Sequence, residues 1–260
     1  MIIDSLTHVT PDGRWFSTCY EASESRLLKE MDEVGVEKAV VIALAGYIEN
    51  DFVAQVCSRH RDRLIPGASI NPVAYSSREE ASAGIKSLLS DGRFAVLKLH
   101  PRFNHYDPLN PICTAVIEEI AKAGSKLPIW IDTYLYYRGG RLIKPPIDTF
   151  HELVGRFPSL NFVLVHGCGV DILRLSQAVR DCPNTFIDIS YTIHQYKGSS
   201  TELDLKYLLQ TFNKRMVFGS DFPEVSLRET LDDFNALTLD LNPEVRNRIL
   251  GNNLKGLLGI

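Results

Sequence analysis

The chain has no long apolar run. Its hydrophobic stretches all fall short of the roughly 20 residues that a membrane-spanning helix needs, so we expect no such helix. The opening segment Met1–Ser5 has no basic residues and places Asp4 where a signal peptide would be apolar. A signal peptide is therefore not expected.

Cysteine is scarce, and neither sign of charge dominates. The five cysteines are odd in number and form no Cys-x-x-Cys pair, which argues against a disulfide framework and favours a cytoplasmic location. The 28 basic and 32 acidic side chains leave a formal net charge of −4, without a basic run. We therefore expect neither nucleic acid nor a membrane surface as a partner.

Instead, the chain contains eight short apolar runs separated by helix-like segments. Eight repeats of a strand and a helix predict a single-domain (β/α)₈ TIM barrel over residues 1–260, within the usual size of that α/β fold. Six or seven repeats would instead indicate an open doubly wound sheet. No Gly-x-Gly-x-x-Gly follows the first run, so we expect no nucleotide cofactor. The runs are Met1–Leu6, Lys38–Ala43, Leu64–Ile70, Phe94–Leu99, Leu127–Ile131, Asn161–Val165, Thr185–Ile189 and Met216–Gly219.

Apolar residues at helical spacing predict the intervening helices. Gly35 follows the first as a C-cap, and a capping-box pattern begins the third. The predicted helices are Glu21–Val34, Asn50–His60, Ser77–Ser90, Leu109–Ala123, Pro146–Phe157, Asp171–Val179, Ser200–Phe212, Leu227–Leu237 and Pro243–Leu258.

Polar side chains stand at the ends of most of the apolar runs. A TIM barrel gathers the carboxyl ends of its strands around one pocket, and catalytic groups come from several of them. Residues i and i+2 of a strand share a face, which places Lys98 with His100. The predicted pocket residues are His8, Lys98, His100, Asp132, His166, Ser190 and Asp221.

Several of these segments resemble motifs of one enzyme family. The segments Ile3–His8, Leu97–Pro101, Val163–Gly167 and Phe218–Pro223 resemble, in order, strands one, four, six and eight of the amidohydrolase-related branch of the amidohydrolase superfamily. The tail Ile249–Leu254 is similar to the closing helix of that family. The resemblance implies a barrel that hydrolyses or decarboxylates small, often carboxylated molecules.

The sequence departs from the family pattern at two metal-ligand positions. Typical members bind one divalent metal through two strand-one histidines, a strand-five histidine and the strand-eight aspartate. Here Leu6 and Asp132 replace two of the histidines. One alternative is a rebuilt site in which His8, Asp132 and Asp221 hold zinc, manganese or iron.

The other alternative is that the metal has been lost. The resemblance allows this, because some superfamily members hydrolyse lactones without a metal. Asp221 would then be the general base for water. Lys98, His100 and His166 would stabilise negative charge.

Residues of three loops are candidates for contact with substrate. Thr133–Pro145 contains Tyr134, Arg138 and a Gly-Gly pair, and is a candidate lid over an anionic substrate. Arg102 follows the fourth strand and can serve the same purpose. The predicted substrate-binding set is Lys98, Arg102, Tyr134, Arg138 and Ser190, with Trp15, Phe16 and Tyr20 as a further wall, and with His105 and His194 in loops at the same end.

Together these features predict a hydrolase for a lactone, ester or amide bond of a small carboxylated molecule. The predicted catalytic residues are Asp221, His166 and His100. The alternatives are a decarboxylase for an aromatic or unsaturated acid, and an inactive barrel that only binds a small molecule. A homodimer is compatible with the sequence, but no motif identifies an interface.

Overall fold

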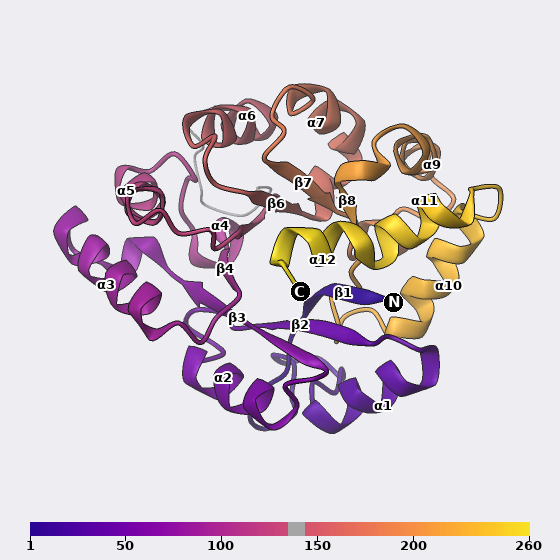
Figure 1. Cartoon of the computed structure of the whole chain (residues 1–260), viewed down its shortest axis with the longest axis horizontal. Coiled ribbons are helices and arrows are strands. Elements are labelled where there is room, and N and C mark those ends of the chain that lie inside the picture. The colour runs from indigo at the N-terminus through magenta and orange to yellow at the C-terminus, as the bar shows by residue number, and fades with distance from the viewer. Residues whose placement is uncertain (135–143) are drawn as a thin grey trace.

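The computed structural model describes residues 1–134 and 144–260. Eight parallel strands in these ranges form one sheet in the order β1 to β8, and helices surround it (Figure 1). The strands are β1 (Ile3–Thr7), β2 (Lys38–Ile42), β3 (Leu64–Ile70), β4 (Val96–Leu99), β5 (Ile129–Asp132), β6 (Phe162–Val165), β7 (Thr185–Asp188) and β8 (Met216–Val217). The predicted TIM barrel is confirmed, and every predicted run overlaps one strand, although β1 and β5 each extend one residue past their runs.

Contacts between β1 and the end of β8 nearly close the barrel. The Ser5 N–H donates to the Phe218 carbonyl at 3.0 Å, and Thr7 forms a parallel bridge with Phe222. The Asp221 N–H donates to the Leu6 carbonyl at 3.0 Å. These bonds place the chain after β8 beside the end of β1, so His8 and Asp221 come from neighbouring positions on the rim.

The helices begin and end close to their predicted limits. Gly35 ends α1 in the left-handed conformation that glycine adopts without steric cost. Ser77 caps α3 by accepting the Glu80 N–H at 3.1 Å. The helices are α1 (Glu24–Val34), α2 (Asn50–Arg59), α3 (Arg78–Asp91), α4 (Pro101–Asn104), α5 (Pro111–Lys122), α6 (Pro146–Arg156), α7 (Ile172–Ala178), α8 (Thr192–Gln195), α9 (Ser200–Thr211), α10 (Leu227–Leu237), α11 (Pro243–Asn247) and α12 (Asn253–Leu258).

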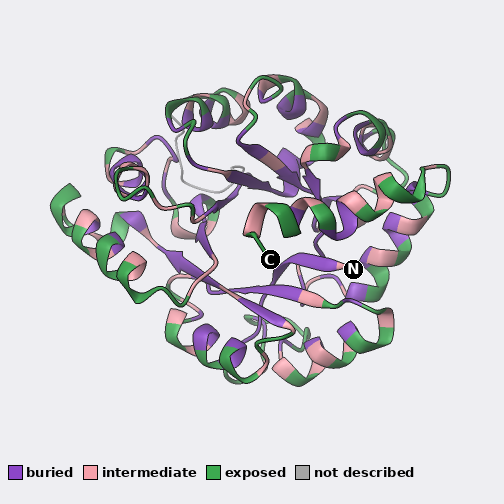
Figure 2. Ribbon diagram, in the orientation of Figure 1, coloured by how far each residue is buried: buried purple, intermediate pink, exposed green. Residues whose placement is uncertain are grey.

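Apolar side chains fill both the barrel and the layer between sheet and helices. Burial follows the sheet, whereas the outer helix faces are exposed (Figure 2). Inside the barrel, Leu6, Val96, Trp130 and Val165 belong to one buried cluster. Leu254 of α12 joins that cluster, which closes the amino-terminal end of the barrel. No helix of the described ranges has both the length and the apolarity to cross a membrane.

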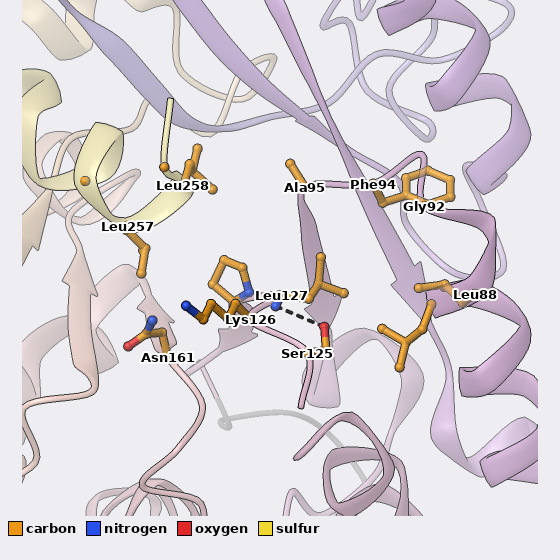
Figure 3. Close-up of a pocket in the computed structure, with 14 residues that line it drawn as sticks. Leu88, Gly92, Phe94, Ala95, Ser125, Lys126, Leu127, Asn161, Leu257 and Leu258 are labelled. Atoms are coloured by element: carbon orange, nitrogen blue, oxygen red, sulfur yellow. Dashed lines mark hydrogen bonds between the residues drawn. The ribbon is translucent and has the colours of Figure 1, made fainter. Parts of the chain in front are cut away.

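A cavity at the amino-terminal end lies beneath α12 (Figure 3). Its volume is about 550 Å³, and Leu88, Phe94, Leu127 and Leu257 contribute apolar walls to it. Most of the side chains predicted to carry chemistry line a different cavity, at the carboxyl ends of the strands; they are His8, Lys98, His100, His166 and Asp221. The amino-terminal cavity is therefore separate from the candidate active site.

Candidate active site

A cavity of about 340 Å³ opens at the carboxyl ends of the strands. Three predicted histidines, Lys98, Arg102 and Asp221 line it together, although they come from strands far apart in the sequence. Trp15, Phe16 and Phe103 form an aromatic wall in the same cavity. The lining residues are His8, Trp15, Phe16, Leu44, Lys98, His100, Arg102, Phe103, His105, His166, Asp221 and Glu224.

His8 is held as a neutral imidazole. Its Nδ1 atom lies 2.7 Å from the carbonyl oxygen of Ile42 and must donate, because a carbonyl oxygen only accepts. The ring stacks on Trp15 at a centroid distance of 5.3 Å. Burial lowers the pKa of His8 well below its ordinary value, and Lys98 acts in the same direction. The neutral ring therefore keeps an unprotonated Nε2 atom.

His100 has the opposite tautomer. Its Nδ1 atom accepts the Phe103 N–H at 3.4 Å, so the proton of the neutral ring is on Nε2. That Nε2 atom lies 3.5 Å from Oδ2 of Asp132. Burial lowers the pKa of His100 to about 3, with Lys98 and Arg102 adding to the effect and Asp132 opposing it. His100 therefore presents an uncharged N–H donor.

Asp132 lies beneath the cavity as a fully buried carboxylate. Its Oδ2 atom is 3.5 Å from His100 and 3.6 Å from His166, and it has no hydrogen-bond partner within the described ranges. Burial by itself raises the pKa of Asp132, but the nearby His100, Arg102, His166 and Lys98 lower it below its ordinary value. Asp132 therefore remains an anion surrounded by nitrogen atoms.

Lys98 is the cation at the centre of this cluster. It lines the cavity, yet only 1% of the residue is exposed. Burial lowers the pKa of Lys98, whereas the carboxylates of Asp132, Asp221 and Asp188 oppose that effect. A buried ammonium is costly unless opposite charges surround it. Lys98 thus balances the carboxylates around the cavity.

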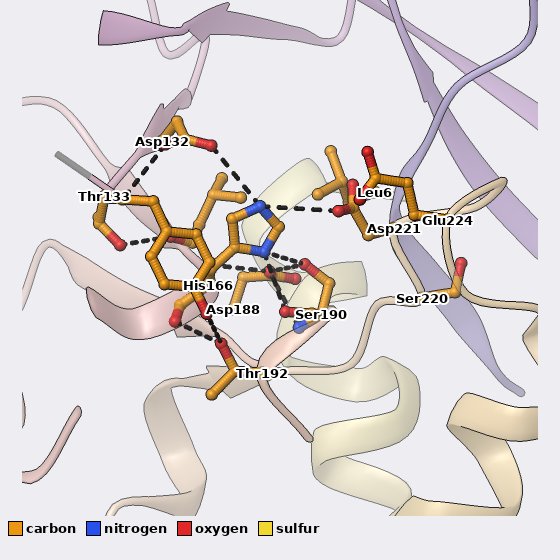
Figure 4. A network of polar contacts seen from close by, with 12 residues as sticks. Leu6, Asp132, Thr133, His166, Asp188, Ser190, Thr192, Ser220, Asp221 and Glu224 are labelled. Carbon is orange, nitrogen blue, oxygen red and sulfur yellow. Dashed lines mark hydrogen bonds and ion pairs between the residues drawn. The ribbon is translucent and has the colours of Figure 1, made fainter. Parts of the chain in front are cut away.

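His166 lies between two carboxylates (Figure 4). Its Nε2 atom is 3.6 Å from Oδ2 of Asp132 and 3.8 Å from Oδ2 of Asp221. Burial raises the pKa of Asp221 to about 6, with Glu224 and Asp132 acting in the same direction and His166 and Lys98 opposing it. Asp221 can therefore take up and release a proton near neutral pH.

The predicted binding residues lie at different depths. The Arg102 side chain is 45% exposed at the cavity, and its Cζ atom is 5.5 Å from the centre of the Tyr134 ring. Tyr134 stacks on His166 at 5.1 Å. Ser190 is fully buried behind His166, so the expected contact of its side chain with substrate does not agree with its placement. Arg138 lies outside the described residues.

The remaining loop residues divide into those that line the cavity and those that do not. Trp15, Phe16 and His105 line the cavity, whereas Tyr20 is not among its lining residues in the described ranges. His194 lies 2.8 Å from an oxygen of Asp233, a carboxylate of α10. His194 is thus engaged with a helix outside the cavity.

Glu224 is a cavity residue that the sequence interpretation missed. Its Oε1 atom accepts the indole N–H of Trp15 at 2.9 Å. Glu224 follows the strand-eight motif by one residue, and the loops after barrel strands carry functional groups. Its position directly after the motif could therefore have identified Glu224 as a cavity residue from the sequence.

The residues present do not fit the predicted metal site. Among residues 1–134 and 144–260, no group of three or more His, Cys, Asp and Glu side chains is arranged to hold a metal ion. In those ranges, His8 has no contact of 4.0 Å or less with Asp132 or Asp221, the other two predicted ligands. The buried Lys98 supplies positive charge at this position instead. The proposed ligand set of His8, Asp132 and Asp221 is not assembled in this structure.

Comparison with solved structures identifies similar barrels. An uncharacterised TIM-barrel protein of Bordetella bronchiseptica is 21% identical, with a TM-score of 0.81, over 99% of this chain and 98% of that chain. A protein described as a probable 2-pyrone-4,6-dicarboxylic acid hydrolase of Acinetobacter baumannii is 14% identical, with a TM-score of 0.70, over 100% and 99%. These similarities show the shared fold.

A third similar structure contains a metal. The 5-carboxyvanillate decarboxylase of Novosphingobium aromaticivorans, complexed with manganese and 4-hydroxy-3-methoxy-5-nitrobenzoic acid, is 12% identical, with a TM-score of 0.72, over 100% of this chain and 96% of that chain. The comparison with curated proteins finds no match. The family model described as Amidohydrolase matches residues 3–260. The chain therefore belongs to the amidohydrolase family of enzymes.

Proposed function

We propose that the chain hydrolyses a lactone, ester or amide bond of a small carboxylated molecule, and that it does so without a resident metal. The observation that carries this proposal is the distance of 3.8 Å between Nε2 of His166 and Oδ2 of Asp221 at the cavity. A base and its partner at this separation can hold and activate one water molecule.

Asp221 is the proposed general base. Its raised pKa, about 6, makes it a better proton acceptor than an ordinary aspartate, while it is still ionised at neutral pH. Water bound between Asp221 and His166 would lose a proton to this pair as its oxygen attacks the carbonyl carbon. The same pair would then return the proton to the leaving oxygen or nitrogen.

Lys98 and His100 are the proposed stabilisers of the oxyanion. Lys98 brings a positive charge and His100 brings an N–H donor, and both line the cavity. Such donors are effective because they are already oriented before negative charge develops on the carbonyl oxygen. Their roles take the place of a Lewis acid in this proposal.

The proposed substrate is a planar or unsaturated acid. Arg102 is the exposed cation at the cavity and can form a bidentate pair with a carboxylate. Trp15, Phe16 and Phe103 offer ring faces and edges, with the Trp15 and Phe16 centroids 4.7 Å apart. Arg138, predicted from the sequence as a second carboxylate ligand, remains a prediction.

The test is acid release from a panel of carboxylated lactones, esters and amides. Wild type should turn over at least one member, and Asp221→Asn should lower kcat by about 10³-fold or more, since the base is removed. Asp240→Asn is the matched control, because Asp240 is an exposed carboxylate that pairs with Lys206. Near-normal turnover by Asp221→Asn would overturn the role of Asp221.

Two other outcomes would replace the hydrolase proposal. Release of CO₂ from aromatic or unsaturated acids, without hydrolysis in the panel, would indicate a decarboxylase. Thermal stabilisation by these acids without any turnover would indicate a barrel that only binds them.

A further inference from the structure

A buried polar network lies behind His166, outside the cavity (Figure 4). Ser5 of β1, Asp188 of β7 and Ser190 after β7 are all fully buried. None of the three is among the described residues that line the cavity. The proposed hydrolysis uses none of these three side chains directly.

Four donors converge on the Asp188 carboxylate. The hydroxyl groups of Ser5 and Ser190 donate to its two oxygens, and the backbone N–H groups of Ser190 and His166 lie 3.1 and 3.3 Å from Oδ1. An ionised carboxylate only accepts hydrogen bonds, and four donors suit that form. Each serine hydroxyl carries a single proton, so the Ser190 proton is committed to Asp188.

The direction of the Ser190 proton determines whether its hydroxyl donates to His166 or accepts from it. The Ser190 hydroxyl oxygen lies 3.1 Å from Nδ1 of His166, and the Ser190 carbonyl oxygen lies 2.9 Å from the same atom. With its proton directed to Asp188, the hydroxyl can only accept, as the carbonyl does. Nδ1 of His166 therefore faces two acceptors and must carry the ring proton.

The backbone of Gly219 packs directly against the network. A Cβ atom at this position would come within 2.4 Å of the Ser5 hydroxyl oxygen, 2.8 Å of Asp188 Oδ2 and 3.1 Å of Ser190 Cβ. Packing against a bare glycine restricts the rotamers of all three side chains. The hydroxyl of Ser190 thus has little freedom to turn toward His166.

We propose that Asp188 is a positioning residue that acts through Ser190 to hold His166 as the Nδ1–H tautomer. The unprotonated Nε2 atom is then directed at Asp132 and Asp221, where it can accept a proton. The resulting role of His166 as a proton acceptor rests on the proposed hydrolysis, but the tautomer does not. Asp188 contacts neither the cavity nor the proposed substrate.

The first experiment measures the tautomer directly. Protein labelled with ¹⁵N-histidine is examined by NMR at pH 8, and His166→Gln identifies the His166 signals. Wild type should show a protonated Nδ1 and an unprotonated Nε2. A protonated Nε2 in the neutral wild-type ring would overturn the proposal. Because no substrate is added, this result stands or falls independently of the hydrolase function.

The second experiment changes the acceptor. Asp188→Ala removes the acceptor of the Ser190 hydroxyl, which frees the hydroxyl proton to turn toward Nδ1. The Nε2–H form should then appear in the spectrum, and kcat should fall by about 10²-fold or more with a smaller change in KM. An unchanged tautomer in the folded variant would show that the Ser190 carbonyl alone is sufficient, and would overturn the role of Asp188.

Ser5→Ala is the matched control. It removes the donor to the opposite oxygen of Asp188 and leaves the bond between Ser190 and Asp188 in place. The Nδ1–H tautomer should persist, and kcat should remain within about 3-fold of wild type. A loss of the tautomer in Ser5→Ala, equal to that in Asp188→Ala, would mean that general packing, and not the Asp188 carboxylate, controls His166.

Discussion

Trp15 and Glu224 are joined across the mouth of the cavity by a hydrogen bond of 2.9 Å from the indole Nε1 to Oε1. The bond connects the loop after β1 with the loop after β8, 209 positions apart in sequence. The bond also holds the Glu224 carboxylate in place, and this carboxylate helps to raise the pKa of Asp221. Glu224 therefore has both a structural and an electrostatic effect.

These two effects can be separated by substitution. Glu224→Gln keeps an oxygen acceptor for Trp15 but removes the negative charge. Because Glu224 raises the pKa of Asp221, the acidic limb of the pH profile of kcat/KM should move to lower pH in this variant. Trp15→Phe removes the hydrogen bond and keeps the charge, so its limb should shift less. A shift of the Glu224→Gln limb to higher pH would contradict this assignment.

The wild-type pH profile should itself have an acidic limb near pH 6. The pKa of Asp221 is raised to about 6, and the base must be ionised, so kcat/KM should rise as pH increases through that value. The pKa of His100 is lowered to about 3, and that of His8 is also lowered, so neither should add a limb between pH 5 and 8. Activity that fell steadily from pH 5 to 8 would contradict the prediction.

Lys98→Met should destabilise the fold. Removing the buried ammonium takes away a positive charge that offsets the carboxylates of Asp132, Asp221 and Asp188, and leaving buried charge uncompensated costs about 3–5 kcal/mol. Urea denaturation measures the change in free energy of unfolding. The double variant Lys98→Met/Asp132→Asn should recover part of the loss. Lys206→Met, at an exposed pair with Asp240, should change stability by less than about 1 kcal/mol; an equal loss there would argue against a special role for Lys98.

Chelation should leave turnover unchanged. The described side chains do not assemble three metal ligands, and the ammonium of Lys98 lies among the carboxylates. Protein purified without chelators is analysed for zinc, manganese and iron, and is then assayed before and after EDTA treatment. About one equivalent of metal, lost from Asp132→Ala together with activity, would restore the metal-dependent alternative.

Asp4 predicts a pH dependence of stability. Burial raises its pKa to about 7 from 3.8, so the folded chain holds a proton that the unfolded chain releases between those values. The stability from this proton is complete below about pH 4 and is lost as pH rises to 7. The free energy of unfolding of Asp4→Asn minus that of wild type should therefore increase over this range, by at most about 1.4 kcal/mol per pH unit. A difference that is independent of pH would exclude this effect.

The sequence predicted the barrel well because apolar runs and helical periodicity are local signals. Each predicted run overlaps its strand, although β1 and β5 extend one residue beyond their runs and β8 is shorter than Met216–Gly219. Polar residues at strand ends also converge by the geometry of the fold, which brought His8, Lys98 and Asp221 to one cavity. Alternation along a strand was sufficient to place Lys98 and His100 on the same side.

Local patterns could not show contacts made across the barrel. Ser190 ends a strand as the other candidates do, yet its side chain faces Asp188 and His166 and not the cavity. A left-handed backbone at Asp221, with φ of 67°, turns the chain so that Glu224 reaches Trp15. Only the folded chain shows that Lys98 lies among three carboxylates.

Three of the four histidines that line the cavity are each anchored to main-chain atoms. His8 is held by the carbonyl of Ile42, His100 by the N–H of Phe103, and His166 by the carbonyl of Ser190. The anchoring atoms belong to the barrel backbone, so replacing a neighbouring side chain leaves those atoms in place. The surrounding side chains are therefore the part of this site that laboratory evolution can change. To obtain activity on new substrates, Arg102, Phe103 and Glu224 should be substituted before the histidines.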